Sequence, residues 1–304
     1  MSITRIGISG WRYKPWRGVF YPPGLPQDRE LEYASRALPT IEINGTFYSL
    51  QTPQSFKRWH EETPPGFVFS VKAPRYITHI LRLRDTDAPL ANFFASGIFY
   101  LKEKLGPIRG QFPPSFRYDA ERMKRFFDLL PFDTGEAAAL ARHRQRRMTG
   151  RARLAIDAVR PIRHAVEIRN ESFLDESYID LLRQHNIAWV IADTAGKWPY
   201  REDITADFLY LRLHGDKELY ASGYTDEALT RWATRIRVWR EGGQPHDAHL
   251  VSPSSTPAHR CRDVYCYFDN DIKVRAPFDA QHLAAKLHET MSSPQSPTPL
   301  AEGE

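Results

Sequence analysis

The chain has 304 residues, of which 41% are hydrophobic and 12% aromatic, so it can bury a sizeable core and is not expected to be disordered. Its formal net charge of +5 is compatible with an anionic ligand or with nucleic acid and does not distinguish between them. Its two cysteines, Cys261 and Cys266, do not have the spacing of a zinc site and are too few for a disulfide framework. The N-terminus does not resemble a signal peptide, and the sequence contains no run of 18 apolar residues. We therefore expect a cytoplasmic protein without a membrane partner.

Eight strand-like runs occur along the chain, and helix-like segments separate most of them. In chain order, the runs are RIGISGW, TIEINGTFY, FVFSVKAP, PIRGQFPP, HAVEIRN, AWVIADT, FLYLRLHG and DVYCYFDN. Helices are expected over about residues 28–38, from Pro53 onward, and over about 87–104, 119–130, 134–160, 175–184 and 225–241. This alternation without a linker predicts an α/β protein with a single (β/α)8 TIM-barrel-like domain over residues 1–290.

Two polar segments, both punctuated by proline, stand out from this pattern. Residues 244–259 (QPHDAHLVSPSSTPAH) lie in the connection before the eighth strand, and we expect them to form a flexible insert on the face opposite the site. Residues 291–304 are rich in proline and serine, and their composition predicts a disordered tail.

Polar residues end nearly every strand-like run. In a (β/α)8 barrel the carboxyl ends of the strands meet at one rim, where active sites are built. Side chains two apart share a face of a strand, and charged side chains cannot face the apolar helix layer, so such pairs should point into the barrel. The sets that share a face are Glu42 with Asn44 and Thr46, Glu167 with Arg169, and Arg212 with His214. Position at a strand end adds Ser9, Lys72, Gln111, Asp193, Asp269 and Asn270 to the same rim.

The charges at this rim nearly cancel. Four carboxylates (Glu42, Glu167, Asp193 and Asp269) face three fixed cations (Lys72, Arg169 and Arg212). Metal sites in barrels concentrate carboxylates and histidines without such competition, so we predict no metal and no cofactor. The alternative to a functional site is an ion-pair network that closes the barrel without any chemistry. A buried ionic network is a poor way to stabilise a fold, however, so positioning a ligand is its better use.

Three further residues each carry two interpretations. Ser9, in GISGW, lacks the second spaced glycine of a serine elbow, so we expect a ligand-contacting or structural hydroxyl. His79 is either catalytic or a cap for the following segment. Trp11 either stacks on a sugar or a base, or packs its loop on the barrel. The arginine-rich stretch 141–153 is either a solvated helix face or a phosphate-binding patch.

The motifs together resemble the DUF72 family of YecE-like proteins. They are ISGWRYKPWRGVFYP, TIEINGTFYSL, FVFSVKAPRYITH, QFPPSFRYD, HAVEIRNESF, YLRLHG with LYASGY, and VYCYFDN. The resemblance implies a TIM-barrel-like fold, but the function of the family is unknown, so it implies no catalytic roles. The motif positions are Ser9, Trp11, Glu42, Asn44, Thr46, Tyr48, Lys72, His79, Gln111, Glu167, Arg169, Asp193, Arg212, His214 and Asn270. The sequence departs from the family pattern at Arg109, which is in phase with Gln111 and adds a cation deeper in the barrel.

These residues favour an enzyme that acts on a small polar or anionic substrate, such as a sugar phosphate or a nucleotide-like molecule. Lys72, Arg169 and Arg212 are expected to hold the anion. His214 is predicted to be the general base, and Glu167 to orient it or the substrate. One alternative is a protein that binds or processes nucleic acid, which is not the favoured partner, and another is a ligand-binding module without turnover.

Overall fold

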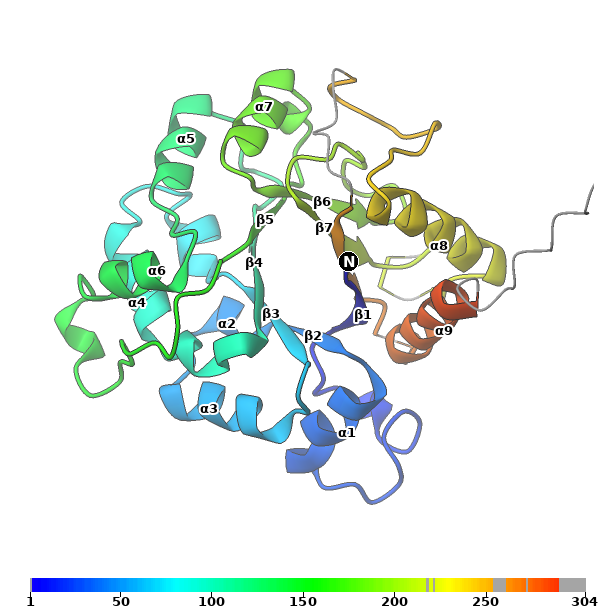
Figure 1. The fold of residues 1–304 in the computed structure, drawn as a ribbon, viewed down its shortest axis with the longest axis horizontal. Coiled ribbons are helices and arrows are strands. Elements are labelled where there is room, and N and C mark those ends of the chain that lie inside the picture. Colours follow the sequence, from blue (N-terminus) through cyan, green and yellow to red (C-terminus); the bar gives the residue numbers. More distant parts are fainter. Residues whose placement is uncertain (1, 217–218, 221, 254–260, 272, 290–304) are drawn as a thin grey trace, which may run out of the picture.

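The computed structural model of the chain describes residues 2–216, 219–220, 222–253, 261–271 and 273–289. Within these residues, eight parallel strands close into a barrel in chain order, with β8 paired to β1 (Figure 1). The strands are β1 Thr4–Ser9, β2 Thr40–Ile43, β3 Val68–Lys72, β4 Leu105–Gln111, β5 His164–Glu167, β6 Ala188–Asp193, β7 Phe208–Leu213 and β8 Asp263–Phe268. The predicted TIM-barrel-like α/β fold is confirmed.

Helices surround the barrel (Figure 1). In the described residues, the α-helices are α1 Glu30–Ala37, α2 Gly45–Tyr48, α3 Pro53–Glu62, α4 Asp87–Ala95, α5 Ala120–Asp128, α6 Thr134–Ala141, α7 Glu176–Gln184, α8 Asp226–Arg240 and α9 Ala276–Glu289. Several begin at a residue whose side chain accepts a hydrogen bond from the first turn, as Thr52 does for α3 and Asp119 for α5. None of the described helices is long and apolar enough to cross a membrane.

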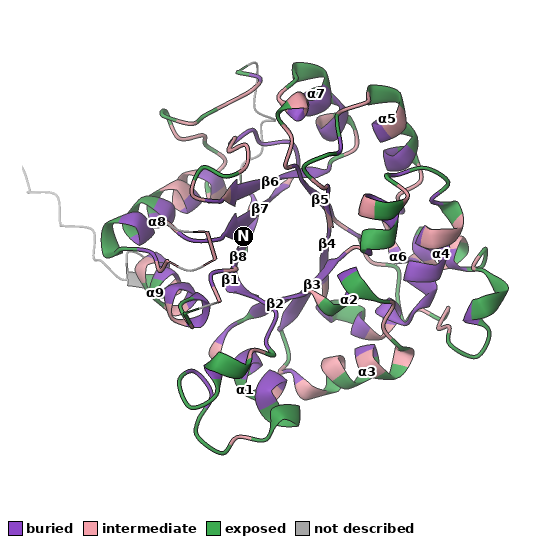
Figure 2. Ribbon diagram, turned by 180° about the vertical axis from the view of Figure 1, so that it is seen from behind, coloured by how far each residue is buried: buried purple, intermediate pink, exposed green. Residues whose placement is uncertain are grey.

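Buried apolar side chains of the described residues form two clusters, separated by the strands. The larger one lies between the strands and the helices, and the smaller one fills the lower part of the barrel interior. Alternation shows this on β6, where Ala188, Val190 and Ala192 belong to the inner cluster while Trp189 and Ile191 belong to the outer one. Figure 2 shows buried residues along the strands and along the helix faces that meet them.

Two predicted helices differ from the structure. The helix expected over 87–104 breaks at Gly97, which has a φ of 117° and separates α4 from a 3-10 helix over Ile98–Lys104. A side chain at Gly97 would meet the Cα atom of Pro53 at 2.4 Å, so only glycine fits this close approach. The helix expected over 134–160 ends as α6 at Ala141. Beyond a short 3-10 turn, the arginine-rich stretch continues as irregular chain, so its interpretation as a helix face is wrong.

The predicted insert is held in part by acidic residues of the β6–β7 connection. That connection, residues 194–207, contains no helix. The carboxylate of Asp203 accepts hydrogen bonds from the backbone N–H groups of Val251 and Ser252, and that of Glu202 accepts one from His249. Residues 244–253 are therefore tied to the barrel wall. Residues 254–259 and the tail 291–304 lie outside the described residues.

Candidate functional site

Four fully buried charged residues form a closed ion-pair network across the barrel. Arg109 Nε lies 2.6 Å from Glu42 Oε2, and Arg109 Nη1 lies 2.6 Å from Glu167 Oε2. Arg212 lies 3.1 Å from each of the same two carboxylates. The four side chains are at most 1% exposed and come from β2, β4, β5 and β7. The prediction that Glu42, Glu167 and Arg212 point into the barrel is confirmed, and so is the deeper cation at Arg109.

Two more residues extend this network toward the rim and balance its charge. Asp269 Oδ2 lies 2.8 Å from Arg212 Nη2, and Arg169 Nη2 lies 2.9 Å from Glu167 Oε1. The network of described residues therefore contains three carboxylates and three guanidinium groups. We call these six residues, Glu42, Arg109, Glu167, Arg169, Arg212 and Asp269, the central network.

The arginines keep the carboxylates ionised in spite of burial. Burial alone would raise the pKa of Glu42, but Arg109 and Arg212 hold that pKa at about 2. Burial is likewise outweighed at Glu167, where the neighbouring arginines hold the pKa well below its ordinary value, and at Asp269, where Arg212 does so. The central network is thus fully charged at neutral pH.

Two hydroxyl groups also donate to the carboxylate of Glu42, and the amide of Asn44 supports one of them. Ser9 Oγ donates to Glu42 Oε1 over 2.6 Å, and Asn44 Nδ2 donates to Ser9 Oγ over 2.9 Å. Tyr210 lies two residues before Arg212 on β7, and its hydroxyl donates to Glu42 Oε2 over 2.5 Å. Ser9 and Asn44 therefore lie at the predicted site, where Ser9 supports the carboxylate.

Lys72 lies at the mouth of the barrel without an ion pair among the described residues. Its ammonium group is 4.0 Å from the centre of the Phe47 ring, a cation–π contact. The side chain is 9% exposed. Burial, followed by the positive charges of Arg109 and Arg212, lowers the pKa of Lys72 to about 7. An amine with this pKa can hold an anion when protonated and can also exchange a proton near neutral pH.

His214 is buried beside the network and is neutral. Its Nδ1 lies 3.0 Å from Asp269 Oδ2, and its Nε2 lies 3.2 Å from Arg212 Nη1. Burial and the charge of Arg212 lower its pKa, although Asp269 opposes them. The ring has no exposed surface, so a substrate reaches it only if neighbouring groups move. Its role as a general base stays a prediction.

His79 lies at the rim on a single turn of π-helix, Tyr76–Ile80, which follows β3. Left-handed backbone at Arg82, Leu83 and Asp85 follows it, and both features mark functional positions in many proteins. The ring packs edge-on against Phe47, with centroids 5.1 Å apart. Burial, followed by the charges of Lys72 and Arg169, lowers the pKa of His79 to about 4. His79 is therefore part of the same mouth, and the positive charges around it keep it neutral.

Three predicted residues make further contacts at the rim. Gln111 accepts a hydrogen bond of 3.4 Å from Arg109. Arg169 also stacks on Trp198, with its guanidinium carbon 5.1 Å from the ring. Thr46 donates to the backbone oxygen of Lys72 over 2.6 Å, so it fixes the end of β3.

Asp193 and Asn270 were assigned to the rim site by their position at a strand end, but neither side chain points into the barrel. Asp193 follows Trp189 and Ile191 on the outer face of β6, and it accepts a hydrogen bond of 3.0 Å from Tyr224. Asn270 follows the outward-facing Phe268 and donates to Asp279 of α9 over 2.7 Å. Both polar groups bind the helix layer.

Some residues of the mouth were missed by the sequence reasoning. Tyr210 lies two residues before Arg212 and shares its face of β7, so strand phase alone could have revealed it. Phe47, which covers Lys72, gives no such signal because it lies on α2. Asp271, just beyond β8, has its pKa raised to about 6 by burial and by the charge of Asp269.

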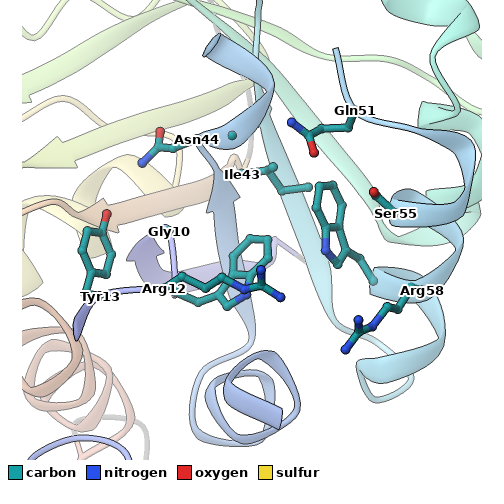
Figure 3. A pocket seen from close by; sticks show the side chains of 11 residues that line it. Gly10, Arg12, Tyr13, Ile43, Asn44, Gln51, Ser55 and Arg58 are labelled. Atoms are coloured by element: carbon teal, nitrogen blue, oxygen red, sulfur yellow. The ribbon is translucent and has the colours of Figure 1, made fainter. Parts of the chain in front are cut away.

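A cleft of about 450 Å³ opens beside the central network. It lies between the loop after β1, the end of β2 and α3 (Figure 3). Trp11 and Asn44 are the predicted site residues that line it. Trp11 is buried and packs edge-on against Trp59, so it serves both to pack the loop and to form the cleft wall. Within the described part of the chain, no group of three His, Cys, Asp or Glu side chains could hold a metal ion.

Known proteins resemble this chain in sequence and in fold. It is 25% identical to the UPF0759 protein YecE of Escherichia coli over 245 residues, which cover 79% of this chain and 84% of YecE. It is 29% identical to the UPF0759 protein YunF of Bacillus subtilis over 116 residues, which cover 36% of this chain and 40% of YunF.

Crystal structures of two DUF72 family proteins share the fold. The one from Thermotoga maritima superposes with a TM-score of 0.70 at 24% identity and covers 94% of this chain and 99% of its own. The one from Enterococcus faecalis superposes with a TM-score of 0.66 at 15% identity and covers 94% of this chain and 96% of its own. The family model for DUF72, described as a protein of unknown function, matches residues 5–302, and this chain therefore belongs to the DUF72 family.

Proposed function

We propose that this protein is an enzyme that acts on a small anionic substrate by acid/base chemistry at the barrel mouth. One observation carries the proposal. The carboxylates and guanidinium groups of the central network pair with one another, and Lys72 remains as an ammonium group without a counter-ion among the described residues. A buried charge without a partner is unfavourable for folding, so its presence favours a functional use.

The surroundings of Lys72 suit an anion. Burial lowers the pKa of His79, and the charges of Lys72, Arg169 and Arg75 lower it further, so several cations act on one place at the rim. Arg212 was also expected to hold the anion, but its donors already serve Glu42, Glu167 and Asp269. A phosphate or carboxylate bound at Lys72 supplies the negative charge that balances the positive charge of its ammonium group.

Proton transfer is the second part of the proposal. Lys72 has a pKa of about 7, so it exchanges a proton readily at neutral pH. His214 is the predicted base, and Glu167 fixes Arg212 beside it. Because His214 is fully buried, Lys72 is the residue that contacts the substrate directly.

The test replaces Lys72 by methionine, which keeps the length of the side chain and removes its charge. Calorimetric titration with inorganic phosphate at pH 6.5 should show affinity reduced at least tenfold in Lys72→Met. The control is Lys124→Met, which removes an exposed lysine from α5 and should bind phosphate like the parent. Unchanged affinity in Lys72→Met would refute the anion site. If phosphate binds as expected but no phosphorylated or carboxylated compound is turned over, the protein is a binding module and not an enzyme.

A further inference from the structure

We infer that the cleft beside the central network binds the sugar ring and the terminal anion of a phosphorylated sugar. This deepens the proposed function by naming a substrate class, and it rests on that proposal only for where turnover occurs. The cleft volume of about 450 Å³ lies within the range of sites for small molecules.

Aromatic side chains form one wall of the cleft. The ring centroids of Trp11 and Trp59 are 5.5 Å apart, and the two ring planes meet at 85°. Two perpendicular indoles make a corner, whereas a flat nucleobase is held best between parallel faces. A sugar ring, which has an apolar C–H face and polar edges, fits a corner of this kind. The wall therefore favours a sugar over a base.

Polar groups at the cleft select for hydroxyls. Gln51 and Ser55 of the α3 region point toward the cleft in Figure 3. Trp11 Nε1 and Asn44 Oδ1 are buried and have no hydrogen-bond partner among the described residues, which is unfavourable for a buried donor or acceptor. Both atoms lie beneath the surface, so a small rotation of each side chain is needed to present them. Sugar hydroxyls both donate and accept, so they can satisfy both atoms.

Two guanidinium groups mark the place of the anion. Figure 3 shows those of Arg12 and Arg58 on the same side of the cleft. Arg58 donates to Glu62 through Nε and to the backbone oxygen of Asp28 through Nη2, so its Nη1 remains available. Arg12 is exposed and forms no ion pair among the described residues. Guanidinium groups bind phosphate well because their donors match its oxygens.

The cleft joins the central network through Asn44. The amide of Asn44 lines the cleft and donates to Ser9, which donates to Glu42. A sugar whose phosphate lies at Arg12 and Arg58 thus has its other end directed toward the network, and the anion expected at Lys72 is a second, separate one.

The experiment is a set of calorimetric titrations of the full chain with ribose 5-phosphate, ribose, inorganic phosphate and adenosine monophosphate. In Lys72→Met, which lacks the anion site of the proposed function, ribose 5-phosphate should bind at least tenfold more tightly than ribose or phosphate alone. The Arg12→Ala, Arg58→Ala double variant should lose at least tenfold in affinity for ribose 5-phosphate. Gln51→Ala, which removes an amide that also donates to Ser49, should lose several-fold. The matched control is Arg160→Ala, which removes a surface arginine paired with Asp157 and should bind like the parent.

The inference is overturned if ribose 5-phosphate binds no better than phosphate, if the double variant binds it like the parent, or if adenosine monophosphate binds more tightly. These outcomes are separate from those for the proposed function. Both sites are supported by two results together. Lys72→Met loses phosphate binding, and the double variant, but not the parent, binds ribose 5-phosphate weakly. Ribose 5-phosphate weakened only by Lys72→Met contradicts the cleft and leaves the proposed function standing.

Discussion

The ammonium group of Lys72 lies 4.0 Å from the centre of the Phe47 ring, at the mouth of a barrel in which the six charges of the central network pair with one another. The aromatic face partly stabilises the positive charge of Lys72. Burial and the nearby charges of Arg109 and Arg212 destabilise that charge. The resulting pKa of about 7 makes Lys72 a cation of this mouth that loses its charge near neutral pH.

Removal of the Lys72 charge should stabilise the fold. The ammonium is buried without a carboxylate partner, so Lys72→Met should raise the free energy of unfolding by about 1–4 kcal/mol at pH 6. Urea denaturation measures the change. A fall in stability would mean that Lys72 is held by interactions that the structure does not show.

Removal of one carboxylate of the network should have the opposite effect. Glu42→Gln leaves Arg109 and Arg212 with less than their full complement of negative charge, and we expect a loss of about 3–5 kcal/mol. Glu61→Gln, which changes an exposed glutamate of α3, is the matched control and should denature like the parent. Equal midpoints for the two variants would show that the central network contributes nothing to stability.

The stability of the protein should depend on pH in two windows. Glu42 has a folded pKa of about 2 and an ordinary value of 4.5, so its contribution is present above pH 4.5 and is lost as the pH falls toward 2. The loss from this group is about 3 kcal/mol. Lys72 has a lowered folded pKa, so the unfolded chain binds more protons between pH 7 and 10.5, and stability should rise with pH there.

Free energies of unfolding measured across pH test both windows. The slope below pH 4.5 should be smaller in Glu42→Gln, and the rise above pH 7 should be absent in Lys72→Met. Identical curves for the parent and both variants would contradict these pKa shifts.

Substitution of His214 tests its predicted role as a base. Once a substrate is found by screening sugar phosphates, His214→Asn should lower turnover by about 10²–10⁴ while binding survives. His60→Asn, which changes a surface histidine paired with Glu103, is the control. Turnover within a few-fold of the parent would assign His214 a structural role, in line with its burial.

The sequence predicted the barrel and most of its interior because strands impose a two-residue period. Charged residues in phase on one strand, such as Arg212 and His214, had to point inward since the other face is apolar. The same period explains the two exceptions. Asp193 and Asn270 were assigned by position at a strand end, although each is in phase with outward-facing apolar neighbours.

Other features depend on partners that are distant in the sequence. Asp203 binds the backbone of Val251 and Ser252, and no local pattern reveals that pairing. Phe47 reaches Lys72 from a helical turn after β2, and the break at Gly97 is required by Pro53. Such contacts follow from the closed barrel and not from local sequence.

The most direct test of the central claim is the pH dependence of sulfate binding, because sulfate does not change its charge near neutrality. We expect the affinity of the parent to fall about tenfold or more between pH 6 and 8.5, as Lys72 loses its proton. Lys72→Arg stays charged and should bind with little change across this range, while Lys72→Met should bind weakly throughout. A parent whose sulfate affinity does not change with pH, or one that Lys72→Met matches at pH 6, would contradict the account.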